Sequence, residues 1–189
     1  MTSLRLPARA ATVVFLLAAN VVAGTAWHEI VGHGLVGIAC GGRLNQIIVV
    51  GVQLWPRLAW TGTRGAFGWC DVEGVSGGVC THLWLLTGSL STLFVSILAI
   101  ALLYARKWNR AFQLILLGCA FWWIDLFTYT LPSFGLRRYI IFGRRISEPY
   151  DAAVALGIPG WMFQLFVVAT CVMLAALSVR ILLKTFAKP

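Results

Sequence analysis

Four long apolar runs divide the chain, at about residues 11–40, 79–104, 111–131 and 152–183. Each is long enough to cross a bilayer as a helix, which takes roughly 20 residues. Short polar segments that carry Arg and Lys separate the runs, as in membrane proteins. The pattern predicts one all-α polytopic membrane domain over residues 1–189 with about four transmembrane helices.

The segment 41–78 breaks this pattern. It contains the β-branched stretch "LNQIIVVGVQLW", and Gly and Pro punctuate the residues that follow. Such a stretch favours a strand over a helix. We therefore expect a short β-strand or hairpin, lying at the membrane surface after the first helix.

Composition supports the bilayer as the solvent. The chain is 60% hydrophobic and 11% charged, with a mean hydropathy of +0.86, whereas soluble domains carry about 25% charged residues. The net charge is +9, but the basic residues lie at the ends of apolar runs. This placement points to lipid as a partner and away from nucleic acid. With the N-terminus inside, 8 of the 15 basic residues lie inside and 7 outside, so charge leaves the orientation open.

A polar cluster stands out in the first apolar run, in "AWHEIVGHGLVGIACGG", residues 26–42. The whole chain has three His and six acidic residues, and His28, Glu29 and His33 fall within six positions. Polar groups in a bilayer are unfavourable unless they are paired, so they usually mark function. Neutral imidazoles bind zinc, and a neighbouring Glu can act as a base toward a water molecule. The cluster predicts a Zn²⁺ site with His28 and His33 as ligands and Glu29 as the catalytic base.

The spacing of the two histidines is unusual, because "HEIVGH" reads HExxxH and the common zinc motif is HExxH. On an ideal α-helix, His28 and His33 lie about 140° apart, and Glu29 and His33 about 40° apart. A one-residue π-bulge, eased by Gly32, would realign the histidines. Alternatively, Glu29 and His33 are the ligands and His28 supports them. We favour the π-bulge.

Three stretches resemble a known family in the same order. They are "HEIVGHGLVGIACGGRLNQIIVV", "LLTGSLSTLF" at 85–94 and "SEPYDAAVALGIPGW" at 147–161. They look like the motifs of the site-2-protease-like membrane zinc metallopeptidases, the M50 group, and of its small bacterial members in particular. The extra residue in HExxxH departs from that family and is similar to the HExxGH of soluble dipeptidyl-peptidase III enzymes. The resemblance implies a multi-pass protein of the bacterial inner (plasma) membrane that cleaves a transmembrane or membrane-proximal protein substrate.

The third zinc ligand is open at this stage. The resemblance implies Asp151, which begins the last predicted helix and could equally be its N-cap. Asp125, in "FWWIDLFTY", could ligate the metal, orient a ligating His or pair with a loop arginine. His82, in "CTHLWLL", is either a substrate or oxyanion group or an interfacial side chain.

The function predicted from these features is intramembrane zinc-dependent peptide-bond cleavage. Glu29 would take a proton from the attacking water and pass it to the leaving amine, and the strand in 41–78 could clamp an extended substrate by edge addition. Two alternatives stay open: a metal-transporting or metal-sensing membrane protein, and a non-catalytic scaffold of the same fold. Neither the particular substrate nor the oligomeric state follows from the sequence.

Overall fold

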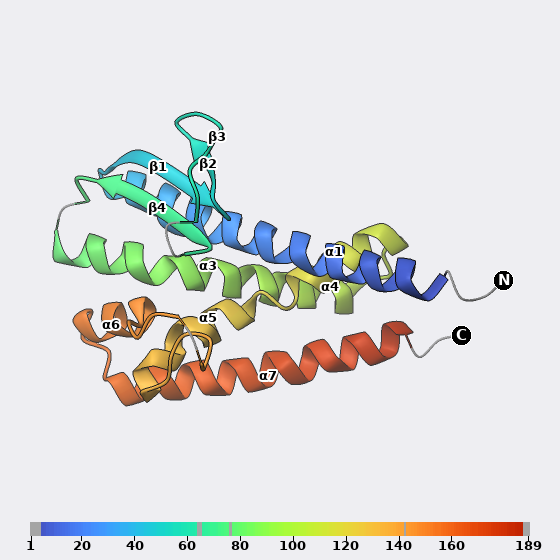
Figure 1. Ribbon diagram of the computed structural model, residues 1–189. Coiled ribbons are helices and arrows are strands. Elements are labelled where there is room, and N and C mark those ends of the chain that lie inside the picture. Colours follow the sequence, from blue (N-terminus) through green and yellow to red (C-terminus); the bar gives the residue numbers. More distant parts are fainter. Residues whose placement is uncertain (1–4, 64–65, 76, 142, 187–189) are drawn as a thin grey trace.

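The computed structural model describes residues 5–63, 66–75, 77–141 and 143–186. Long helices run side by side, and a small sheet lies over one end of them (Figure 1). Within these residues, four helical segments are long and apolar enough to cross a membrane: Val14–Ala39, Gly78–Ala105, Arg110–Phe134 and Gly160–Thr185. Their number and order agree with the four spans expected from the sequence.

The first span is a continuous helix whose winding changes along its length. Helix α1 (Arg5–Trp27) leads into a π-helical segment (His28–Leu35), and α2 (Val36–Ala39) completes the last turn. A π-helix bonds each N–H to the carbonyl five residues back, so residues five apart lie on one face. The π-distortion expected from the HExxxH spacing is therefore confirmed, although it extends over eight residues instead of a single bulge.

The segment after the first span forms more β-structure than a hairpin, so the all-α description needs correction. Strands β1 (Arg43–Val49), β2 (Val52–Trp55), β3 (Ala59–Trp60) and β4 (Gly68–Glu73) make an antiparallel sheet in the order β3-β2-β1-β4. The β-branched end of β1 is buried. Strand β4 is at an edge of the sheet and pairs with β1 across a long connection, which a local pattern does not reveal.

Helix α3 (Gly78–Ala105) is the central element and matches the predicted second span. The π-helical segment and all six other α-helices of the described residues contact it. Its buried face is rich in small residues, among them Gly88, Ser89 and Thr92. Small side chains let helix backbones approach closely, as is usual at helix interfaces in membranes.

The third and fourth apolar runs are each broken, which corrects the single helices expected at 111–131 and 152–183. The third run contains α4 (Arg110–Cys119), α5 (Trp123–Thr130) and a 3₁₀ turn (Leu131–Phe134). The fourth begins earlier than expected, with α6 (Glu148–Ala155), and resumes as α7 (Gly160–Phe186). Helix α6 ends at Ala155 and α7 begins at Gly160. Between them, Gly157 has a φ of +90°, which is readily adopted only by glycine, and Pro159 lacks an N–H, so neither residue continues the helix.

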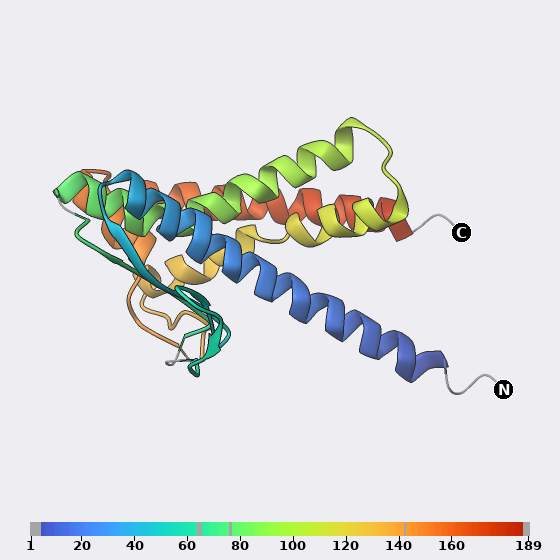
Figure 2. The same cartoon turned by 90° about the horizontal axis from the view of Figure 1, so that it is seen from above.

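Helix α1 departs from the other helices along its N-terminal half, as seen from above in Figure 2. Its apolar side chains there, such as Val14, Phe15 and Leu17, are exposed. The hydrophobic core lies instead among α3, α4, α5, α6 and α7, around fully buried residues such as Leu126, Val167 and Leu174. The polar cluster sits at the other end of α1, where the helix turns into the π-helical segment and meets α3 and the sheet.

Candidate functional site

The π-helical segment brings the two histidines of the cluster face to face. The Nε2 atoms of His28 and His33 stand 3.0 Å apart, and both residues are buried at 3% and 6% exposure. The rings meet edge to face, with centroids 4.8 Å apart. Of the two geometries open from the sequence, the structure has the one that pairs the histidines.

The other nitrogen of each ring is already engaged. His28 Nδ1 lies 2.7 Å from Asp125 Oδ2, and His33 Nδ1 donates to the Trp84 carbonyl oxygen at 2.8 Å. A carboxylate and a carbonyl can only accept, so both Nδ1 atoms carry the hydrogen. In the neutral rings both Nε2 atoms are then acceptors. The Nε2 lone pairs of His28 and His33 therefore point toward each other and repel. A proton or a metal cation bound by both nitrogens would remove this repulsion.

Aromatic rings and a close helix contact hold the imidazoles in place. Tyr129 stacks on His28 with ring centroids 4.9 Å apart, and Trp84 meets the His33 ring at 5.4 Å. The Thr87 hydroxyl donates to the Gly32 carbonyl oxygen at 2.8 Å, which ties α3 to the π-helical segment. A Cβ placed on Gly32 would stand 2.5 Å from the Gly88 Cα, so this contact requires glycine.

Gly88 also leaves space beside the imidazole pair. A Cβ at this position would stand 2.5 Å from both His28 Nε2 and His33 Nε2. The absence of a side chain on α3 thus keeps the point between the two nitrogens open.

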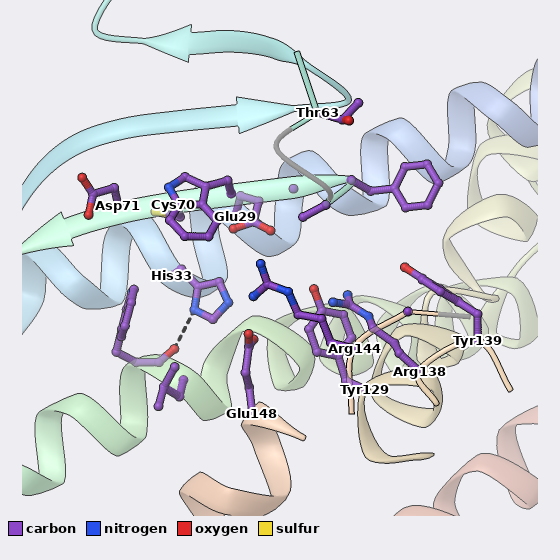
Figure 3. Close-up of a pocket in the computed structure, with 17 residues that line it drawn as sticks. Glu29, His33, Thr63, Cys70, Asp71, Tyr129, Arg138, Tyr139, Arg144 and Glu148 are labelled. Carbon is purple, nitrogen blue, oxygen red and sulfur yellow. Dashed lines mark hydrogen bonds between the residues drawn. The ribbon is translucent and has the colours of Figure 1, made fainter. Parts of the chain in front are cut away.

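Glu29 lies on the wall of a cavity of about 640 Å³ and is buried at 4% exposure. Figure 3 shows its carboxylate, with His33, facing this space from the π-helical segment. A Cβ on Gly68 of β4 would collide with the carboxylate, so a glycine is required where the sheet crosses it. The rest of the wall includes Phe67 and Gly68–Asp71 of β4, Trp84 and Leu85 of α3, Tyr129 at the end of α5, and Arg138, Tyr139, Arg144 and Glu148 beyond it.

The other sequence-predicted residues fall in different places. Asp125 is beside His28 and also accepts a hydrogen bond from Thr92 at 3.0 Å, so it is placed to orient the His28 ring. Asp151 is exposed and does not line the cavity. It lies within α6 and does not cap it, because Ser147 holds the N-cap position. His82 is half-buried in the first turn of α3, away from the cavity.

Several residues of the site were not singled out from the sequence. Glu148 is the acidic side chain of a late helix that reaches the cavity, three residues before Asp151. Four arginines follow the third apolar run, Arg137, Arg138, Arg144 and Arg145, but the sequence does not indicate which of them reach the cavity. Among the described residues, no cluster of three or more His, Cys, Asp or Glu side chains has the arrangement of a complete metal site.

Cys70 on β4 also lines the cavity. Burial, with smaller contributions from Glu29 and Asp71, raises the pKa of its thiol to about 12. Without a bound metal, the group is therefore a neutral thiol at physiological pH.

Comparison of the chain with protein-family models, with curated proteins and with solved structures gave no match in any of the three.

Proposed function

We propose that the protein is a membrane-embedded zinc metallopeptidase that cleaves a peptide bond within or close to the bilayer. The observation that carries this proposal is the pair of imidazoles with converging Nε2 atoms, each held by a hydrogen bond at Nδ1. Glu29 stands next to the pair in the chain and faces a cavity large enough for an extended peptide segment.

The pair fits zinc on three counts. Atoms that each lie about 2.0–2.1 Å from a tetrahedral zinc stand about 3.3–3.4 Å apart, close to the 3.0 Å between the Nε2 atoms. Zinc-bound histidines usually donate their other N–H to a carboxylate or a carbonyl, as His28 and His33 do. Gly88 keeps side-chain atoms out of the space that the ion would need.

The chemistry that Zn²⁺ supplies when bound is Lewis acidity, which polarises a peptide carbonyl and makes a water molecule easier to deprotonate. Glu29 is placed to handle the proton. Its carboxylate forms no hydrogen bond with another described residue and faces the cavity, so it is free to accept a proton from the attacking water. As the water oxygen bonds to the carbonyl carbon and the C–N bond breaks, Glu29 returns that proton to the leaving amine.

The sheet suggests how the substrate would be held. Strand β4 is an edge strand, and Phe67–Asp71 border the cavity beside Glu29. An extended peptide can add to an exposed strand edge through main-chain hydrogen bonds. A substrate paired with β4 would lie in the extended form that a peptidase needs, with its backbone close to the Glu29 carboxylate.

The third ligand is proposed from two sources. The family resemblance implies Asp151, whereas position in the cavity favours Glu148, which lies one helical turn earlier on α6. A catalytic zinc usually has three protein ligands and one open position. Asp125 is engaged by His28 and Thr92, so we assign it to orientation of His28.

The test is bound metal in detergent-purified protein, measured by elemental mass spectrometry. Near one zinc per chain is expected, with loss in His33→Ala and in one of Glu148→Gln and Asp151→Asn, which identifies the third ligand. His82→Ala is the matched control and should keep the metal, because His82 lies away from the cavity. A wild-type protein that takes up no zinc at neutral pH would overturn the proposal.

A further inference from the structure

The loop between the 3₁₀ turn and α6, residues 135–147, carries four arginines, and they divide into two pairs. Arg138 and Arg144 line the cavity, whereas Arg137 and Arg145 do not. The backbone N–H of Arg138 donates to the Arg144 carbonyl oxygen at 3.1 Å. This bond closes the loop and holds the two inward side chains together, so that both guanidinium groups point into the cavity in Figure 3.

Arg138 is held by stacking and not by a counter-ion. Its Cζ lies 2.9 Å from the centroid of the Tyr129 ring, which in turn stacks on His28. Its Nε is buried and has no hydrogen-bond partner. Burial lowers the pKa of its guanidinium below the ordinary value, opposed by the neighbouring acidic groups, yet arginine keeps its charge at any physiological pH.

Neither guanidinium has an ion-pair partner within the described residues, where the ion pairs are His28–Asp125 and Arg43–Glu73. Glu29 and Glu148 share the cavity but do not come within 4.0 Å of Arg138 or Arg144 as salt bridges. Arg138 is partly buried, and a partly buried cation without a partner has lost water without gaining an anion. Arg144 is exposed but lines the same cavity, so the two guanidinium groups together offer a site for an anion that enters it.

We propose that Arg138 and Arg144 form a carboxylate subsite for the peptide substrate, which binds an acidic side chain or the C-terminal carboxylate near the bond next to Glu29. This inference rests on the proposed function. Guanidinium groups bind carboxylates through paired N–H···O bonds. Glu29 and Glu148 face the same space, so a monoanion is favoured over a phosphate dianion, which their charges would repel. The edge of β4 across the cavity suits a peptide.

The test is equilibrium binding, by fluorescence anisotropy in detergent, to the Glu29→Gln variant so that no probe is consumed. The probes are four labelled peptides on one Leu/Ala host: a central Glu or Gln, each with a free or an amidated C-terminus. A charged probe should bind about tenfold more tightly than its neutral twin, as for one charge-assisted hydrogen bond. Preference for central Glu indicates an acidic side chain, and preference for the free terminus indicates a C-terminal carboxylate.

Arg144→Glu is the decisive variant, because Arg144 is exposed and its replacement should leave the fold intact. Arg144→Glu should abolish or reverse the preference for the charged probe over its neutral twin. Arg138→Lys keeps the positive charge but loses the planar guanidinium group, so it should reduce this preference. Arg137→Gln and Arg145→Gln are matched controls from the same loop and should retain it. Equal binding of charged and neutral probes, binding of no probe, or a preference that survives Arg144→Glu would each overturn the subsite.

The two proposals fail separately. Anisotropy needs neither metal nor turnover, so an arginine-dependent preference in a protein that takes up no zinc would keep the subsite and remove the peptidase. Zinc-dependent cleavage with no preference for a carboxylate would keep the peptidase and remove the subsite.

Discussion

The two walls of the cavity hold their polar side chains in opposite ways. On the side formed by the π-helical segment and α3, His33 lines the cavity and its partner His28 does not. Each of the two imidazoles has Nδ1 fixed by a hydrogen bond and Nε2 directed at the other ring. On the wall formed by loop 135–147, Arg138 and Arg144 enter the cavity without an ion-pair partner within the described residues. The first arrangement suits a tightly bound metal ion, and the second suits a substrate that binds and dissociates. We refer to them as the imidazole wall and the arginine wall.

Glu29 belongs to the π-helical segment and faces the cavity, and its replacement should have the largest effect. Glu29→Gln removes the group that accepts the proton, and we expect cleavage to fall by about 10²–10⁴-fold while zinc content stays unchanged. The measurement is the count of new peptide N-termini released from a mixture of membrane proteins in reconstituted vesicles. Glu73→Gln, an exposed site on β4, is the control. If function survives Glu29→Gln, the non-catalytic scaffold becomes the better account.

Asp125 tests whether the imidazole wall is built for a resident metal. Asp125→Asn keeps an acceptor near His28 Nδ1 but removes the negative charge, and such replacements typically weaken metal affinity by about 10–100-fold. The measurement is a competitive zinc titration against a chelator of known affinity. Arg144→Gln on the arginine wall should change zinc affinity less than twofold. An equal loss of zinc affinity in Asp125→Asn and Arg144→Gln would show that the two walls do not differ in metal binding.

Gly88 tests the open point between the imidazoles. Gly88→Ala would place a methyl group 2.5 Å from both Nε2 atoms, and overpacking of this kind is unfavourable by about 1–3 kcal/mol. We therefore expect zinc affinity to fall by about tenfold or more. Gly78→Ala, at the first residue of the same helix, meets nothing within 4 Å and should leave zinc affinity unchanged. Unaltered zinc affinity in Gly88→Ala would show that the ion does not bind between the Nε2 atoms.

The sequence predicted the imidazole wall much better than the arginine wall, and the reason is physical. The histidines are five residues apart on one helix, so their relation depends on helix winding alone, and the π-helical solution follows from the spacing. Four apolar runs likewise determine four helical segments. Local pattern was sufficient in both cases.

The features that were missed depend on contacts between distant segments. Strand β4 exists because it pairs with β1, and its own sequence, "GWCDVE", is a weak strand signal. Glu148 and Arg144 reach the cavity because the last apolar run breaks into α6 and α7 and because loop 135–147 folds back on itself. Asp151 was chosen by motif order, and the break places it on the exposed side of α6.

The smallest expected effect concerns the hydrogen bond between α3 and the π-helical segment. Thr87 donates to the Gly32 carbonyl oxygen at 2.8 Å while also lying 2.8 Å from the Leu83 carbonyl oxygen. Thr87→Val keeps the shape and removes the donor, so about 1 kcal/mol of stability should be lost, equivalent to a fall in Tm of about 2–4 °C for a chain of this size.

The matched control for that variant is Thr81→Val, which removes a longer bond of 3.4 Å to the Gly77 carbonyl oxygen within the first turn of α3. Its Tm should change by less than half as much, because Thr81 does not connect two elements. Zinc affinity discriminates further: it should fall in Thr87→Val, since the carbonyl that loses its partner lies next to His33, and stay constant in Thr81→Val. Equal Tm values and equal zinc affinities in the two variants would mean that the π-helical segment holds the imidazoles in place without help from this contact with α3.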